Sequence, residues 1–263
     1  MKAYVSVFSA RFRMLLQYRA AALAGFATQL FWGLIRVMIF QAFFLSSRIQ
    51  QPMNVEEVTT YIWLGQAIFA ILPFRPAAEI ISQVREGSIA FEMLRPVNIY
   101  FFWYCRSLAE KLAPTILRAS PLIPIAGLFF GMQSPANQSA LLFFVVSLSL
   151  AFLLSAAFAM LLNILLLWTL SPEGINSITG ALLLIFSGMI VPIPFFPDSL
   201  QFVVKSLPFR GIIDTPLRIY TGNCAGLELI YAILHQTAWI AVLFVLGYWM
   251  MSKAWSRLVI QGG

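Results

Sequence analysis

Long apolar runs, separated by short polar segments, follow one another along the chain. The six runs cover residues 20–45, 61–74, 112–130, 140–170, 175–191 and 227–251. A helix needs about 20 apolar residues to cross the hydrocarbon core of a bilayer. The pattern therefore predicts an all-α, polytopic membrane bundle of about six transmembrane helices, forming a single domain over residues 1–263.

Two of these runs depart from a simple span. The second is short, so we expect its helix to begin near Val58 and to continue past Pro73. The third contains Pro114, Pro121 and Pro124, which membrane helices tolerate as kinks when neighbouring groups satisfy the freed carbonyls. We expect a bent third helix.

The later runs differ in their connections. Ser171-Pro172-Glu173-Gly174 is a turn that joins the fourth and fifth spans as a helical hairpin. Three prolines then end the fifth span, and residues 192–221 have mixed polarity before the last span begins. This segment should be more than a plain loop.

Residues 1–19 have the pattern of an amphipathic helix. Arginines interrupt the apolar residues and no small-residue cleavage site follows, so the segment is not a secretory signal peptide. We expect one apolar face to lie on the membrane: Tyr4, Val5, Phe8, Phe12, Leu15 and Leu16. The basic residues on the other side should reach anionic headgroups: Lys2, Arg11, Arg13 and Arg19.

The longest polar stretch, residues 75–111, mixes charged and apolar residues at helical spacing. A short surface helix can run to Arg85, and Gly87 can end it in a left-handed conformation. A break of this kind exposes the neighbouring charges, Arg85 and Glu86, to a soluble partner. A merely interfacial helix is the alternative.

Composition excludes a soluble fold. The chain is 60% hydrophobic and only 10% charged, whereas about a quarter of the residues in soluble domains are charged. The net charge of +7 does not indicate nucleic-acid binding, because the basic residues are scattered between apolar runs.

The scattered basic residues predict the topology, since cytoplasmic loops carry the excess of Lys and Arg. With both termini inside, the cytoplasmic segments hold 11 of them: Lys2, Arg11, Arg13, Arg19, Arg75, Arg85, Arg95, Arg106, Lys111, Lys253 and Arg257. The outer segments hold 4: Arg48, Lys205, Arg210 and Arg218. Cys105 and Cys224 then lie toward opposite faces, so a disulfide between them is not expected.

Catalytic motifs are sparse. The chain has no Gly-x-x-x-x-Gly-Lys-Ser/Thr loop, so it does not hold ATP itself in the usual way. One His and two Cys do not make a metal site of the usual kind, and no metal or catalytic residue is expected. The best enzymatic alternative is an intramembrane serine protease that pairs Ser187 with His235, although Ile185 replaces the usual glycine.

Three features in order carry a family resemblance. They are the charged amphipathic N-terminus, the segment from Arg85-Glu86-Gly87-Ser88-Ile89 to Leu94-Arg95-Pro96, and Ser187-Gly188 leading to Pro192, Pro194 and Pro197. Together they resemble the permease subunits of type-2 ATP-binding-cassette exporters over nearly the whole chain. The N-terminal helix is similar to the elbow helix of that family.

The resemblance implies a half-transporter that pairs with a second permease, identical or related. Two cytoplasmic ATPase subunits would carry ATP and Mg, and no cofactor is expected on this chain. The coupling helix would span about residues 77–88, where Glu79, Arg85 and Glu86 would face the ATPase beside the break at Gly87. A re-entrant outer gate would cover residues 192–221, with a helix starting at Pro197-Asp198. The gate residues would be Pro192, Pro194, Phe195, Phe196 and Pro197.

The compact chain is most similar to exporters of small amphiphilic or toxic compounds in the bacterial inner membrane. By resemblance, the first, second and fifth spans would line the path. An ATP-independent secondary transporter or channel is the alternative.

Arg36 lies midway along the first span, where an ionised side chain costs about 2.5 to 3.5 kcal/mol unless it finds water or a partner. Glu228 is the only acidic residue of another run that suggests itself, so water or a backbone carbonyl is expected instead. We expect Arg36 to face the translocation path together with Trp32, Ile39 and Phe40. Snorkelling or helix pinning is the alternative.

Overall fold

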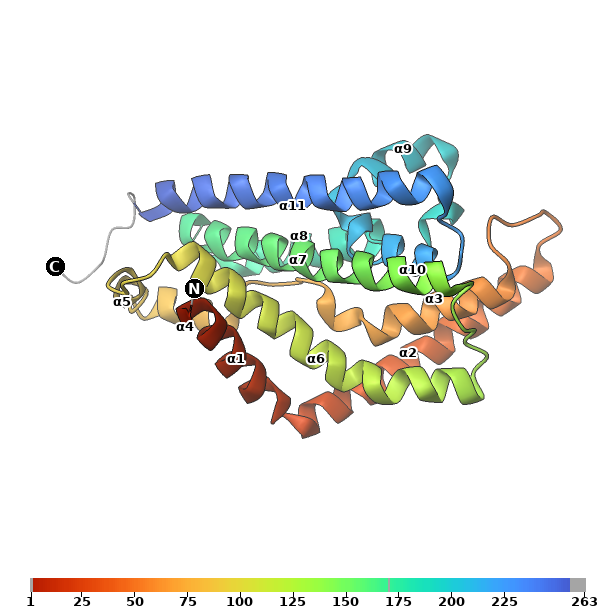
Figure 1. Cartoon of the computed structure of the whole chain (residues 1–263), viewed down its shortest axis with the longest axis horizontal. Coiled ribbons are helices and arrows are strands. Elements are labelled where there is room, and N and C mark those ends of the chain that lie inside the picture. Colours follow the sequence, from red (N-terminus) through yellow and green to blue (C-terminus); the bar gives the residue numbers. More distant parts are fainter. Residues whose placement is uncertain (1, 170, 256–263) are drawn as a thin grey trace.

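The computed structural model describes residues 2–169 and 171–255, and these are mostly helical with no strand among them. Four helices are long and apolar enough to cross a membrane: α2 (Arg19–Ser46), α6 (Ile99–Phe129), α7 (Gln138–Thr169) and α11 (Gly226–Trp255). They run along the long dimension of the molecule (Figure 1). The predicted polytopic all-α bundle is confirmed. Two residues used in the predictions, Leu170 and Arg257, lie outside the described residues.

The second expected span is a short helix, α3 (Val55–Ala67). It begins with a capping box in which Asn54 and Glu57 each accept the other's backbone N–H at 2.8 Å. It ends at Ala67, a 3-10 turn η1 (Phe69–Ile71) follows, and the chain then runs without helix to α4 (Ala78–Arg85). The expected continuation past Pro73 is therefore wrong. Leu72 is extended, because a residue before proline is disfavoured in helical conformation.

Polar side chains of α6 and α7 hydrogen-bond to backbone groups between α3 and α4, in residues 68–77. Lys111 Nζ donates to the Leu72 carbonyl at 3.3 Å, and the Ser155 hydroxyl donates to the carbonyl of Ile71. Asn163 Oδ1 accepts the Ala77 N–H at 2.8 Å. Irregular backbone is tolerated at membrane depth only when it is buried in protein and hydrogen-bonded. The break in the second span meets this condition.

The third span begins earlier than the sequence predicts. Helix α6 starts at Ile99, where Asn98 accepts the Phe101 N–H at 3.3 Å, and it continues through all three prolines. Residues 99–111 therefore belong to this helix and not to a surface segment, because Tyr100 and Trp103 are buried against α7 and α11. As expected for a proline-containing helix, α6 changes direction along its length (Figure 1).

The N-terminal helix α1 (Lys2–Leu16) lies alongside the first half of α6 (Figure 1). The Tyr4 hydroxyl accepts the Asn98 N–H at 3.1 Å, and the rings of Tyr4 and Phe101 are 6.1 Å apart. One expectation is corrected: Arg11 turns toward the protein rather than toward headgroups, because carboxylates of α4 and α6 attract it. Val5 is exposed, which is compatible with a membrane-facing position.

The fifth span is α8 (Pro172–Phe186), which ends before the expected Val191. Gly188 follows with φ of 83°, a conformation that favours glycine. A Cβ at this position would also lie 2.5 Å from the Tyr61 hydroxyl. The close approach of α3 therefore requires a glycine where α8 ends.

Short helices fill the segment before the last span. They are η2 (Ile193–Phe195), α9 (Asp198–Ser206), η3 (Pro208–Gly211) and α10 (Asp214–Tyr220). Helix α9 begins at Asp198 after Pro197, so the expected helix start is confirmed. Cys224, in the loop after α10, and Cys105 are both free, and burial raises the pKa of the Cys224 thiol to about 11.

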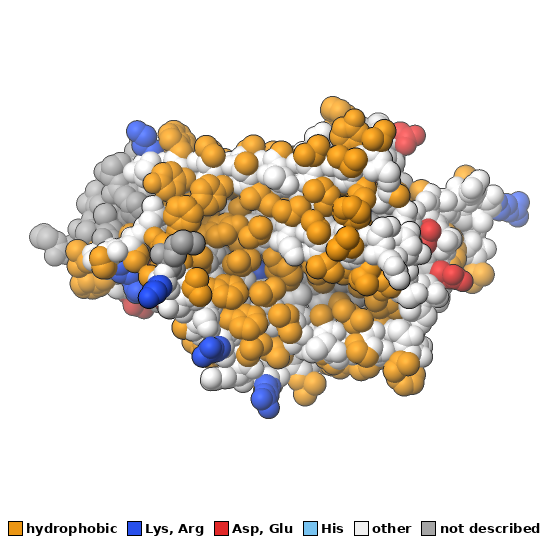
Figure 2. Space-filling model, viewed as in Figure 1, with side chains coloured by type: hydrophobic (Ala, Val, Ile, Leu, Met, Phe, Trp, Pro, Cys, Tyr) orange, Lys and Arg blue, Asp and Glu red, His pale blue; other side chains and the backbone are white. Residues whose placement is uncertain are grey.

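The two ends of the bundle collect different segments (Figure 1). The α4 end holds α1, α4, the short helix α5 (Ala90–Met93) and the turn between α7 and α8. The α9 end holds α9, α10 and the loops around residues 47–54 and 130–137. Figure 2 shows apolar side chains over the middle of the visible face and charged ones mostly toward its margins. The inside and outside groups inferred from charge therefore lie at opposite ends, and the orientation in the cell stays a prediction.

Candidate functional site

Arg36 turns from α2 toward the segment that follows α8. Its guanidinium NH2 donates to the Ile190 carbonyl at 2.9 Å, while its buried Nε has no hydrogen-bond partner among the described residues. One turn earlier, a Cβ on Gly33 would lie 2.4 Å from the Trp63 ring, so α2 and α3 approach closely here. The expected backbone carbonyl is thus the partner that the structure gives to Arg36.

The Glu228 carboxylate pairs with Arg218 at 2.8 Å and not with Arg36. The acidic residue of the site is Asp214 in α10, which is only 1% exposed. Our sequence reasoning missed it, since it lies in a segment of mixed polarity outside the six apolar runs. The sequence feature that could have indicated it is a single carboxylate flanked along the chain by Ile212, Ile213 and Pro216.

Asp214 joins three segments that are distant in sequence. Its Oδ1 lies 3.0 Å from the Tyr61 hydroxyl of α3 and accepts the Ile193 N–H at 3.1 Å. Its backbone N–H donates to the Ser187 carbonyl at 3.0 Å, and the Tyr61 hydroxyl also lies 3.0 Å from the Gly188 carbonyl. A buried carboxylate is strongly destabilising unless it is hydrogen-bonded in this way. The network therefore holds residues 187–193 against α3.

Phe195, one of the five expected gate residues, packs against α2. Its ring centroid lies 5.7 Å from that of Phe40, 6.2 Å from Phe43 and 6.3 Å from Phe44. These rings meet edge to face, a favourable arrangement for aromatic pairs. Phe40 of the expected path and Phe195 of the expected gate are thereby brought together.

The other expected gate residues surround this contact without a shared cluster. Pro192, directly before η2, is buried, and Pro194, within η2, is half-buried. Pro197 is exposed at the start of α9. Phe196 is half-buried, and its carbonyl accepts the side-chain amide of Gln201 at 2.9 Å. The prolines thus shape the backbone, and Phe195 makes the aromatic contacts.

The expected path residues divide between two faces of α2. Arg36 and Phe40 contact the rest of the chain, whereas Trp32 and Ile39 are 52% and 60% exposed. An exposed aromatic residue in the middle of a membrane helix faces lipid or another protein chain. The structure therefore does not gather all four residues into one lining within the single chain.

The expected coupling residues lie on or directly after α4. Gly87 has φ of 71°, which confirms the left-handed break. Arg85 and Glu86 are exposed, and Arg85 pairs with Glu173 of α8 at 3.1 Å. Both partners of this pair are well solvated, so the pair itself contributes little to stability.

Glu79 is arranged differently from its neighbours. Its carboxylate pairs with Arg106 of α6 at 2.6 Å and with Arg11 of α1 at 3.3 Å. Arg11 also pairs with Glu110 at 2.6 Å. This four-residue ion-pair cluster of Arg11, Glu79, Arg106 and Glu110 links α4 to α1 and α6. The side chain of Glu79 is thus engaged within the chain, while Arg85 and Glu86 form the solvated tip.

The protease arrangement is not present. The Ser187 hydroxyl is buried and accepts the Met189 N–H at 3.3 Å. The His235 ring instead lies 3.4 Å from the Ser206 carbonyl and packs near Trp239. A nucleophile and its base must lie within hydrogen-bond reach of one another, and these two side chains have different partners.

A family model described as ABC-2 family transporter protein matches residues 30–262. No curated protein matches the chain. The matched residues cover most of the chain, including α3, α4, the α8–α10 segment and α11.

Proposed function

We infer, from the premise that the chain belongs to the ABC-2 transporter family, that it is the membrane-spanning permease of an exporter for small amphiphilic or toxic compounds. The protein would lie in the bacterial inner membrane, with both of its termini in the cytoplasm. Membership of this family implies an ATP-binding-cassette component as partner. ATP and Mg would be held by that separate subunit.

One observation carries this function best: α3 joins the two sites described above. Midway along α3, Tyr61 and the buried Asp214 hold the segment that follows α8. From the C-terminal end of α3 the chain continues through η1 and residues 72–77 into α4, whose tip carries Arg85 and Glu86. A displacement of α4 by an ATPase would therefore act through α3 on the segment around Ile190 and Phe195.

The ion-pair cluster supports a second mechanical link. Glu79 on α4 pairs with Arg11 and Arg106, so a displacement of α4 would be transmitted to α1 and the first half of α6. Residues that are joined in such a cluster resist independent motion because each displacement leaves a partly buried charge unpaired. The exposed pair Arg85 and Glu86 would then meet the ATPase.

The exposed face of α2 supports pairing with a second permease. Trp32 and Ile39 project from the chain on the helix that also carries Arg36 and Phe40. A path between two permeases would place these residues against the partner and the Arg36 region beside the cleft. A guanidinium near aromatic rings suits compounds that combine a polar group with an apolar body.

Co-purification and transport test this function together. The full chain would be tagged and isolated with its accompanying subunits, and the complex would be placed in liposomes with a fluorescent amphiphile. We expect an ATPase to co-purify and transport to require ATP and Mg. Transport by the chain alone, without any ATPase, would instead establish a secondary transporter or channel.

A further inference from the structure

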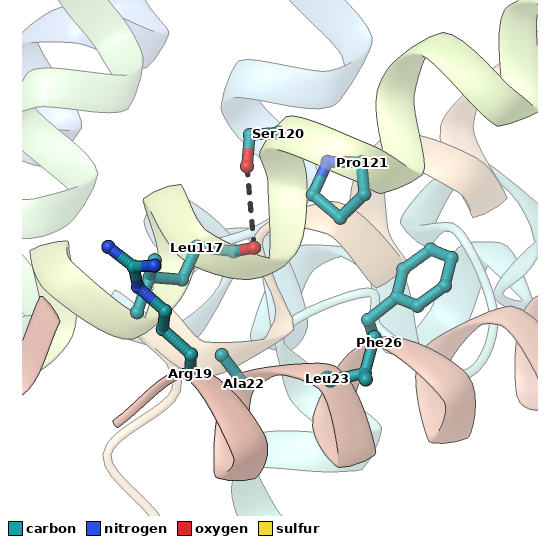
Figure 3. A pocket seen from close by; sticks show the side chains of 7 residues that line it. All are labelled: Arg19, Ala22, Leu23, Phe26, Leu117, Ser120 and Pro121. Atoms are coloured by element: carbon teal, nitrogen blue, oxygen red, sulfur yellow. Dashed lines mark hydrogen bonds between the residues drawn. The ribbon is translucent and has the colours of Figure 1, made fainter. Parts of the chain in front are cut away.

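A groove runs between the start of α2 and the second half of α6, apart from the gate and the coupling tip. The α2 side is formed by Arg19, Ala22, Leu23 and Phe26, as Figure 3 shows. The α6 side is formed by Leu117, Ser120 and Pro121. Its volume is about 420 Å³, and Leu23 is 66% exposed at its edge.

The groove is apolar along most of its length. The one hydroxyl in its wall, that of Ser120, donates to the Leu117 carbonyl of the same helix at 3.4 Å. It therefore has a partner and needs none from a ligand. An open apolar channel between two membrane helices suits a hydrocarbon chain, which fills such a surface without unsatisfied polar groups.

Cationic groups border the same groove. Arg19 lies in its wall at the start of α2. Arg118 follows Leu117 on α6, and a Cβ on Gly25 would lie 2.4 Å from its Nε, so its guanidinium packs on the bare backbone of α2. That Nε is buried and has no hydrogen-bond partner among residues 2–169 and 171–255. No carboxylate of these residues pairs with Arg19 or Arg118.

The depth of these charges restricts the ligand. Arg118 lies eight residues beyond Glu110 on α6, about 12 Å further along the helix axis, and Glu110 belongs to the ion-pair cluster with α1. Arg118 is thus set inward from the charged α4 end, beside apolar side chains. A ligand that satisfies it must bring an anionic group to the start of a hydrocarbon chain.

We propose that this groove binds one anionic phospholipid, with its phosphate between Arg19 and Arg118 and an acyl chain along Leu23, Phe26, Leu117 and Pro121. Charge complementarity selects this occupant over a zwitterionic lipid, because Arg19 lines the groove, Arg118 packs on α2 beside it, and no carboxylate of the described residues pairs with either. Gly25 is the residue that lets the Arg118 guanidinium lie against α2. The bound lipid bridges α2 and α6, and this role does not depend on coupling to an ATPase.

Native mass spectrometry of the full chain with its accompanying subunits tests the proposal. Phosphatidylglycerol and phosphatidylcholine with identical acyl chains would be titrated separately. Phosphatidylglycerol should bind more tightly, and Arg118→Gln should weaken its binding by about fivefold, the usual effect of one basic residue near anionic lipid. Arg118→Lys should keep the preference. Arg13→Gln, which removes an exposed charge from α1, should leave binding unchanged.

A second variant tests the groove without changing charge. Ala22→Trp fills the apolar channel and should abolish phosphatidylglycerol binding even though both arginines remain. Equal binding of the two lipids, competition by inorganic phosphate alone, or normal binding by Ala22→Trp would each overturn the proposal. A Leu23→Cys chain that crosslinks to a second copy would show that protein, not lipid, covers the groove, and would overturn it as well.

Discussion

The Tyr61 hydroxyl lies 3.0 Å from Oδ1 of Asp214, which ties α3 to α10 across 153 residues of chain. The same carboxylate oxygen accepts the Ile193 N–H at 3.1 Å, so α3, η2 and α10 share one buried acceptor. A carboxylate that is buried among apolar residues is kept only where several donors surround it. This arrangement makes residues 187–193, which precede the expected gate residue Phe195, an integral part of the bundle.

Removing the Tyr61 hydroxyl should loosen that segment. We expect Tyr61→Phe to destabilise the protein by about 2 kcal/mol, because a buried charged acceptor loses a donor. Thermal unfolding in detergent measures the change, and Asp214→Asn completes a double-mutant cycle. The two substitutions should be non-additive, since they remove one shared contact. Simple additivity would show that the two groups are not coupled.

Arg36→Gln should change the preference among transported amphiphiles while leaving expression and ATPase binding intact. The variant loses the charge of Arg36 but keeps a polar side chain with an N–H donor at this position of α2. Transport rates for anionic, neutral and cationic fluorescent compounds measure the effect. The matched control is Arg48→Gln, which removes an exposed arginine just beyond the other end of α2. Identical profiles for all three proteins would rule out a lining role.

Reversing both charges at the coupling tip, with Arg85→Glu and Glu86→Arg, should reduce ATPase docking or transport-stimulated hydrolysis at least several-fold. The spans should stay folded, because both side chains are solvated. Pull-down of the ATPase and its hydrolysis rate are the measurements.

A swap separates docking from the internal ion pair at this tip. Arg85→Glu combined with Glu173→Arg restores the local attraction with reversed sign. If the swap restores hydrolysis fully, the internal pair matters and the docking assignment is wrong.

Asn163→Ala should destabilise the break in the second span. The Ala77 N–H would be left in the protein interior without its 2.8 Å acceptor, which costs about 1–3 kcal/mol. Ser149→Ala on the same helix is the control, because the Ser149 hydroxyl is exposed and bonded within its own helix; its effect should stay within about 0.5 kcal/mol. Equal melting temperatures for the two variants would mean that water replaces Asn163 as the acceptor of the Ala77 N–H.

Cysteine scanning should show alternating protection along residues 202–213. Cysteines at Phe202 and Val203 should react with maleimide, since both positions are exposed, and those at Val204, Phe209 and Ile213 should not. The native Cys224 should add little background near neutral pH, because it is buried and its pKa of about 11 keeps it protonated. Uniform labelling of all five positions would indicate an ordinary loop.

Local chemistry was enough to predict much of this fold. The apolar runs of α2, α7 and α11 are long enough to demand helices that cross a bilayer. Gly87 follows α4 and Pro197 precedes α9, because glycine adopts the left-handed conformation at little cost and proline fixes its own φ. The buried break after α3 and the early start of α6 were not predictable in this way, since both depend on what packs around them.

The candidate site depended still more on tertiary structure. The sequence alone marked Arg36 as a charge that must find a partner, because the cost of an ion in hydrocarbon follows from its position in an apolar run. Only the folded chain decides that Ile190, 154 residues away, supplies the acceptor. Asp214 and Tyr61 likewise carry no local signal of their pairing, and Glu79 meets Arg11 and Arg106 only after three helices pack. Side-chain partners are chosen by proximity in space, which a one-dimensional pattern of polarity does not contain.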